Sequence, residues 1–392
     1  MLSKKNYLVT LEQQHTETGS NVLSGLHLHK ASQSKTLQLV LFEQLVWESL
    51  FPVLSVCYQH LLNVDDYTRV IVHIFKNMVL VSAQYPESLQ TPLYASLNAL
   101  IGFTGVTGAQ QLIQGERGAF VVGSIIKMMK SSLLRLKPVW KDLYSFVGKL
   151  RVYFPEFSAR TIAVAQQPGS QGRMSMIEPQ DIEDGAMLLF STVPKSEITD
   201  LYHKDFHRLD MKAQPDLFKA ISQVCAEELK EGPSVCFTTF DCLWSIMHHN
   251  DKVFSPEKMV SYWESLTHLV VMISQNAVAK GASWSELLHR EVVDKIMSLL
   301  KKVLAISRSQ GRDSAANKIV FDALYRIHKS KNDPRYSETL IDTSLEVYLS
   351  ANDPNLHHGW FFLTKASMDI VNNSSLSWRT PVKQKILSVV LC

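Results

Sequence analysis

The stretch "PDLFKAISQVCAEELKEG", Pro215 to Gly232, contains the pattern on which the fold prediction depends. Its apolar residues recur at i, i+1, i+4, i+7, i+8 and i+12, which places them along one side of an α-helix. These residues are Leu217, Phe218, Ile221, Val224, Cys225 and Leu229. Gly232 and Pro233 follow and end the helix. The stretch therefore predicts an amphipathic helix that buries one face.

Helical spacing of apolar residues continues over most of the chain. Downstream, serine caps start two further helices, at Ser255 in "SPEK" and at Ser283 in "SWSE". Upstream, apolar periodicity between proline breaks predicts more helices. Their ranges are 37–50, 52–62, 67–84, 92–101, 109–136 and 139–153, with Pro138 breaking or kinking the chain between the last two. No convincing strand pattern is present, so the sequence predicts an all-α protein.

A short breaker repeats near the C-terminus. Asn-Asp-Pro recurs at Asn332 and Asn352, twenty residues apart, and each interval holds one helix and a short turn. Two such helices make about 40 residues, which is the period of paired-helix repeats. In spacing and apolar pattern this region resembles the HEAT and armadillo superfamily of helical repeats. The resemblance implies an α-solenoid of stacked antiparallel helix pairs, whose function is binding.

One segment departs from the helical pattern and divides the chain. The stretch from Val164 to Met187 contains prolines and glycines but no sustained apolar stripe, which predicts a loop. A chain of 392 residues also exceeds the usual limit for one core, about 250 to 300 residues. The predicted segments are a polar leader at 1–34, an N-terminal helical block at 35–157, a loop or linker at 158–196, and a C-terminal helical repeat block at 197–392.

Composition restricts the compartment and the partners. A hydrophobic content of 46% and a charged content of 20% are typical of a folded soluble protein, and a net charge of +3 gives no general attraction to nucleic acid. Five cysteines without a CxxC pair suit a reducing compartment. We find no signal peptide and no apolar run near the ~18 residues of a membrane span. The sequence therefore predicts an intracellular protein, cytoplasmic or nuclear, with no membrane span.

Several histidines and one cysteine are candidate metal ligands. They are Cys242, His248 and His249 in "CLWSIMHHND", His357 and His358 in "NLHHGW", and His203 and His207 in "HKDFH". On a helix the first adjacent pair diverges by about 100°, so it cannot aim at one ion. The i, i+4 pair has the spacing of helical zinc ligands but lacks the glutamate of HExxH. We interpret these residues as ordinary helix residues and predict no metal site.

No catalytic motif is present in the sequence. The glycine-dense "GFTGVTGAQQLIQGERG", from Gly102 to Gly118, has no nucleotide-binding spacing and follows no strand, which favours a flexible connection between helices. There is also no G-x-S-x-G, kinase signature or recognisable dyad. An enzyme would need polar side chains to converge in one pocket, such as His203, His207, Glu227 or Asp241. We therefore predict a non-catalytic protein without a cofactor, with an enzyme of unrecognised site as an alternative.

Basic residues supply the candidate partner-binding positions. Between Lys127 and Arg151 the chain carries seven cations against Asp142 alone, and on an unbroken helix four of the lysines would share one narrow arc. If the array placed these and later cations on one concave face, that face would bind a phosphate backbone or an acidic protein segment. The candidates are Lys127, Lys130, Lys137, Lys141, Lys301, Arg308 and Arg312.

Together these patterns favour a scaffold or adaptor. Such a protein binds protein partners through an extended helical-repeat surface, with a few buried aromatic anchors supplying most of the affinity. The alternative from another class is a nucleic-acid-associated factor that uses the basic helices.

Overall fold

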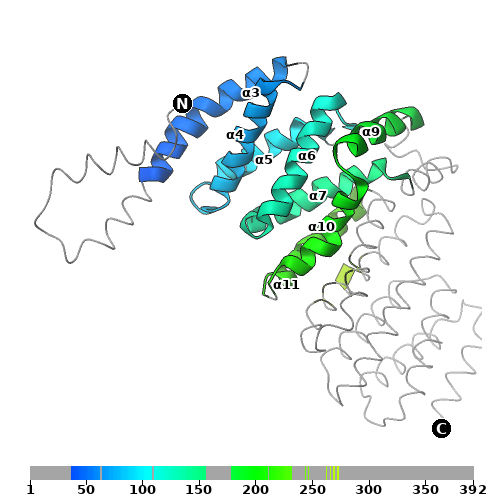
Figure 1. Cartoon of the computed structure of the whole chain (residues 1–392). Helices are drawn as coiled ribbons and strands as arrows, with labels where there is room; N and C mark the ends of the chain where they lie inside the picture. The colour runs from blue at the N-terminus through cyan, green and yellow to red at the C-terminus, as the bar shows by residue number, and fades with distance from the viewer. Residues whose placement is uncertain are drawn as a thin grey trace, which may run out of the picture. The chain divides into compact units, whose positions relative to one another are not determined.

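The computed structural model describes the helices of two compact units (Figure 1). The described ranges are 37–61, 64–107, 110–155, 178–210 and 212–231, with single positions between 243 and 272. The first unit ends at Ala99 and the second begins at Leu100. Helices make up nearly all of both described parts, which confirms the all-α prediction for them.

The described part of the first unit begins with one continuous helical rod, Leu37–His60. Residues 37–41 are α-helical, Phe42–Leu50 form the π-helix η1, and Phe51–His60 form α3. The sequence predicts two helices with a break before Pro52, and the structure joins them. The proline lies in the first turn of α3, where its fixed φ is compatible with the helix.

The core of the first unit lies between the inner side of this rod and α4 (Asp66–Ser82), which packs against α3. Asp65 caps α4, since its carboxylate accepts a hydrogen bond of 2.7 Å from the backbone N–H of Thr68. That bond holds the pKa of Asp65 below its ordinary value. The ring of Phe51 lies 5.2 Å from the fully buried ring of Phe75. After a turn, α5 (Gln90–Gly102) leads into the second unit.

The second unit is a set of helices preceded by a very short hairpin. Its elements are β1 (Val106–Thr107), β2 (Gln110–Gln111), α6 (Gly115–Ser132), the 3-10 segment η2 (Leu133–Val139), α7 (Trp140–Leu150), η3 (Arg151–Tyr153), α9 (Pro179–Thr192), α10 (Lys195–Arg208) and α11 (Gln214–Glu231). The helix predicted from the opening stretch is α11. Pro138 breaks the chain as predicted, because it lies within η2 between α6 and α7.

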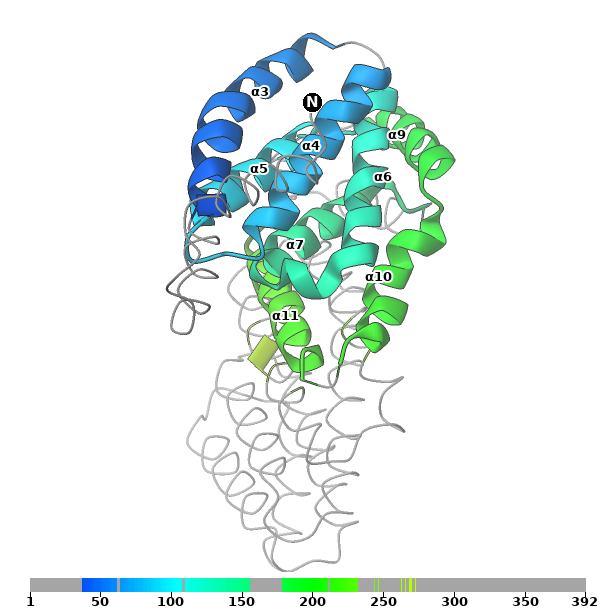
Figure 2. The ribbon, with the colours of Figure 1, turned by 60° about the vertical axis from the view of Figure 1, so that its left-hand side comes forward.

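The later helices of this unit pack on the earlier ones (Figure 2). α9 and α10 contact α6, and α11 contacts α7. The hydroxyl of Tyr144 on α7 donates a hydrogen bond of 3.1 Å to the carbonyl of Leu201, and its ring meets that of Tyr202 edge-on at 5.2 Å. Arg151 is 2% exposed, and its guanidinium carbon lies 4.1 Å from the centroid of the Tyr202 ring. Aromatic contacts thus join α7 and η3 to α10.

A residue beyond α11 completes a second aromatic cluster. The ring of Tyr262 lies 5.1 Å from Phe218 of α11 and 6.3 Å from Phe206 of α10, edge-on to both. All three side chains are buried, and burial raises the pKa of Tyr262 to about 12. The cluster connects the two helices through a side chain that follows them in sequence.

The prediction of a loop or linker across 158–196 is wrong for its second half. Pro179–Thr192 is the helix α9, and α10 begins at Lys195. The buried face of α9 contains Ile182, Gly185 and Leu189, and a Cβ at Gly185 would lie 2.5 Å from Cε1 of Tyr153. The apolar stripe of α9 is not apparent in the sequence because Gly185, which has no side chain, occupies one of its core positions. Residues 156–177 lie outside the described ranges.

The glycine-dense connection between α5 and α6 contains an ordered turn. β1 and β2 pair antiparallel, with Val106 opposite Gln111 and Thr107 opposite Gln110. Gly105 has a φ of +82°, and a Cβ at Gly118 would lie 2.5 Å from the carbonyl oxygen of Thr104. These two glycines allow a tight turn and a close approach of α6 to it.

Other predicted elements fall outside the described residues. They are the leader at 1–34, the helix that starts at Ser283, and the Asn-Asp-Pro repeats at Asn332 and Asn352. The helix predicted from Ser255 is described only at positions 262, 265, 268, 269 and 272, and each of these is helical.

Candidate functional site

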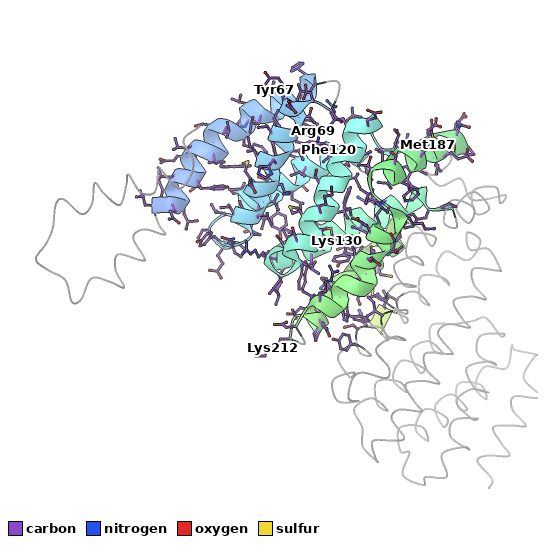
Figure 3. All side chains as sticks on the ribbon, viewed as in Figure 1. Tyr67, Arg69, Phe120, Lys130, Met187 and Lys212 are labelled. Atoms are coloured by element: carbon purple, nitrogen blue, oxygen red, sulfur yellow. The ribbon has the colours of Figure 1, made fainter. Side chains whose placement is uncertain are left out.

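Three of the four lysines predicted as a basic arc form ion pairs with acids on later helices. The pairs, measured from Nζ to a carboxylate oxygen, are Lys130 with Glu197 (3.6 Å), Lys137 with Asp216 (2.5 Å) and Lys141 with Glu227 (2.6 Å). Lys130 lies where α6 approaches α10 (Figure 3). The lysines come from α6, η2 and α7, because η2 interrupts the helix that would have aligned them.

These ion pairs reduce the net positive charge of the predicted basic surface. Their side chains are between 23% and 53% exposed, so each pair contributes only about 0–1 kcal/mol to stability. Each one, however, places a carboxylate within a few ångströms of the ammonium group. The attraction of this surface for a phosphate backbone is therefore weaker than the lysines alone would give.

The structure describes one of the four remaining candidate cations. Lys127 is exposed on α6 and, among the described residues, makes no ion pair. Lys301, Arg308 and Arg312 lie outside the described ranges.

Asp142 lies beside the Lys141–Glu227 pair, in the first turn of α7. Partial burial removes solvent from its carboxyl group and raises its pKa above the ordinary value. The charge of Lys141 acts in the opposite direction, and that of Glu227 reinforces the rise. The charged form of Asp142 is therefore less favourable in the folded protein than in water.

The residues considered for metal binding or catalysis do not form a cluster in the described part of the chain. No group of three or more His, Cys, Asp or Glu side chains there could hold a metal ion. Glu227 pairs with Lys141. His203 and His207 lie on α10, and their side chains are not among those described. Cys242, Asp241 and the histidines at 248, 249, 357 and 358 lie outside the described ranges.

A different surface, on the rod Leu37–His60, exposes apolar side chains. We call its solvent-facing side the outer face. The apolar side chains on it are Leu37, Val40, Leu45, Val53 and Val56, each between 40% and 58% exposed. The opposite side holds the aromatic contacts: Trp47 and Phe51 have ring centroids 4.3 Å apart, and Tyr58 is 2% exposed. The rod is therefore apolar on both sides, and α4 covers only one of them.

The middle of the rod, η1, mixes exposed polar and apolar side chains. In η1 the exposed residues are Glu43, Gln44, Leu45, Glu48 and Ser49, whereas Phe42, Val46, Trp47 and Leu50 are less exposed. The Ser49 hydroxyl donates to the carbonyl of Gln44, five residues earlier, at 2.9 Å. Leu45 and Ser49 are four residues apart and lie together in the middle of the outer face. Glu43 stands four residues before Trp47 and so lies nearer the inner side. No lysine or arginine occurs between Lys35 and Arg69.

The length of this rod bears on the expectation that the chain has no membrane span. Leu37–His60 contains 24 residues and, among the described helices, is the one long and apolar enough to cross a bilayer. This test uses only length and composition. A helix that binds a protein partner through its apolar side has the same composition, so the test does not distinguish the two.

Sequence reasoning recognised the helices of the rod but missed its outer face. Apolar spacing predicts a helix, but it does not show which of its sides a neighbouring helix covers. The available signal was a helical segment that is apolar on all sides and yet contains Glu43 and Glu48. Comparison with family models, with curated proteins and with solved structures finds no match for this chain.

Proposed function

We propose that this chain is a non-catalytic scaffold that binds protein partners through exposed helical surface, and that its helices form an α-solenoid of stacked antiparallel pairs. The observation that supports binding most directly is the outer face. Nine large hydrophobic residues are exposed in the described part of the chain, and five of them lie on this one rod. Concentrated exposed apolar surface of this kind marks interaction sites on soluble proteins.

Two further exposed residues belong to the same unit. Tyr67 and Val70 on α4 are 74% and 56% exposed, and Tyr67 extends away from the helix into solvent (Figure 3). A tyrosine of this kind is a frequent anchor in protein interfaces, because it is large, rigid and amphipathic. Seven of the nine exposed hydrophobic residues therefore lie in the first unit.

The charge arrangement favours protein binding over the nucleic-acid alternative. Three of the candidate lysines already have carboxylate partners within the chain. A nucleic acid would have to displace these acids or tolerate them beside its phosphates, at a cost in affinity.

The proposal is tested by affinity capture of the full chain at low and high salt. We expect the variant Leu45→Ser with Val53→Ser and Val56→Ser to lose the partners that the parent chain retains in high salt. Leu134→Ser is the matched control, since Leu134 is 56% exposed on η2, close to the 58% of Leu45. Capture of salt-labile nucleic acid alone, or equal capture by the triple variant, would contradict the proposal.

A further inference from the structure

We propose that η1 is a two-state segment: its π-helical form assembles the outer face, and an α-helical form of the same residues would divide that face. The inference concerns how the surface can be regulated, so its consequence for binding rests on the proposed function. It follows from the number of residues in each turn of the rod.

The turns of η1 are wider than those of the α-helical segments on either side of it. The backbone N–H of Phe51 donates to the carbonyl of Val46, five residues earlier, which is the π-helical pattern. A π turn contains about 4.4 residues instead of about 3.6, so each residue advances about 80° around the axis instead of about 100°. Over the nine residues of η1 this difference sums to about half a turn. The π-helix therefore rotates residues 37–41 by that amount relative to α3.

This rotation brings Leu37 and Val40 onto the outer face. Val40 and Leu45 are five residues apart, which corresponds to about 140° around an α-helix but to little more than one full turn of a π-helix. Ser49 follows Leu45 by four residues and precedes Val53 by four, so the alignment continues into α3. With α-helical turns throughout, Leu37 and Val40 would lie on the side opposite Val53. The outer face is therefore continuous only while η1 is π-helical.

An α-helical form is the nearest alternative, because the rod is apolar on both sides and π turns are uncommon. In the π-helical form Leu39 and Phe42 are less exposed, whereas Leu37 and Val40 are 44% and 40% exposed. A half turn of this end of the rod would exchange the two pairs. One apolar pair would then be covered in place of the other, so most of the apolar burial is kept. Two packings of similar free energy are what allow a segment to change its form when a partner binds.

Pairs of introduced histidines that chelate Zn²⁺ report the size of the turn in the full chain. Gln44→His with Ser49→His places two exposed imidazoles five residues apart, on one side of a π-helix but about 140° apart on an α-helix. Leu45→His with Ser49→His, four residues apart, chelates in either form and shows that the segment is helical. Met187→His with Thr192→His is the matched control, because these exposed residues are five apart on the α-helix α9.

Isothermal titration calorimetry with Zn²⁺ measures the affinity of each variant. We expect the Gln44 and Ser49 pair to bind at least about tenfold more tightly than either of its single histidine variants, because both imidazoles hold one ion. The Met187 and Thr192 pair should gain nothing over its single variants. No gain for the Gln44 and Ser49 pair overturns the inference, whether or not the Leu45 and Ser49 pair chelates.

Phe42→Ser tests whether η1 has a second form. It removes a large apolar side chain that the π-helical form covers, so the α-helical form should gain population. We expect the affinity of the Gln44 and Ser49 histidine pair for Zn²⁺ to fall about threefold or more, while the Leu45 and Ser49 pair keeps its affinity. Val40→Ser is the control, since it removes a side chain that only the α-helical form would cover, and it should weaken neither pair. Unchanged affinity of the first pair, or an equal loss in both pairs, overturns the inference.

The consequence for binding is tested with Leu37→Ser combined with Val40→Ser, since π turns alone align these two residues with the rest of the outer face. We expect this variant to lose the same proteins as the triple variant of Leu45, Val53 and Val56. If it retains proteins that the triple variant loses, the inference is overturned and the proposed function stands. The proposed function fails separately, when the triple variant captures the same proteins as the parent chain, and the Zn²⁺ titrations then still decide the geometry of η1.

Discussion

The outer face of the first unit and the paired lysines of the second unit are two different kinds of exposed surface. In the second unit each of the three paired lysines meets an acid from a later helix, so the charges join elements of one chain. In the first unit the outer face of the rod exposes apolar side chains that α4 leaves uncovered. A charged cluster in a sequence therefore indicates a binding surface only after its partners within the chain are known.

The largest loss of stability should come from the α4 residue that packs against the inner side of the rod. Phe75→Ala removes a fully buried ring that packs 5.2 Å from Phe51, and we expect a loss of about 3–5 kcal/mol in the stability of the first unit. Hydrogen exchange of peptides from α3 and α4 measures it. Val70→Ala, on the exposed side of the same helix, is the control and should stay within about 0.5 kcal/mol. Similar exchange in the two variants would remove the distinction between inner and outer sides.

A smaller effect should follow from Gly185→Ala in the second unit. The new methyl group would lie 2.5 Å from Cε1 of the Tyr153 ring, so the ring or α9 must shift, at a cost of about 1–3 kcal/mol. Thermal unfolding measures the change. Gly102→Ala is the matched control, because nothing lies within 4 Å of the added Cβ there. If both variants melt alike, α9 does not pack on η3 as described.

The ion pairs of the second unit should contribute less to stability than these buried contacts do. A double-mutant cycle of Lys137→Ala and Asp216→Ala should give a coupling energy of about 0.2–1 kcal/mol that decreases with salt. Lys127→Ala combined with Asp216→Ala should show no coupling, because Lys127 makes no ion pair in the described part of the chain. A coupling of zero for Lys137 would mean that this surface remains available to an anionic partner.

The smallest change in stability is expected from a substitution of Asp142. Because burial raises the pKa of this carboxyl group, the folded state binds its proton more tightly than the unfolded state does. The protonated side chain therefore favours folding at low pH, and this advantage is lost as pH rises through the raised pKa. We expect Asp142→Asn to be slightly more stable than the parent chain at pH 7, by up to about 0.5 kcal/mol, and to lose this gain near pH 3. A gain that is equal at both pH values would contradict the assignment.

The local sequence pattern predicted most of the helices. It did not predict which residues distant in sequence contact each other. Apolar spacing located α4, α7 and α11, and Pro138 marked the interruption between α6 and α7. The pair Lys137–Asp216 spans 79 positions, so the run of cations before Arg151 seemed unopposed. The helix α9 was missed because Gly185 fills a core position with no side chain.

The outer face was missed for a different physical reason. Periodicity shows which residues are apolar, but it does not show how many of them a neighbouring helix covers. On the rod Leu37–His60 only the side with Phe51 and Tyr58 meets α4. Exposure of Leu45 and Val56 is a property of the packed unit, and the sequence alone leaves it open.

The position of Tyr262 affects where the chain can be shortened for laboratory use. A fragment that stops at Glu231 would include Phe206 and Phe218 but remove the ring that lies against both. Those two phenylalanines would then face water at the new end, and such fragments should aggregate. A recombinant second unit is better ended beyond Leu269, which is itself 1% exposed.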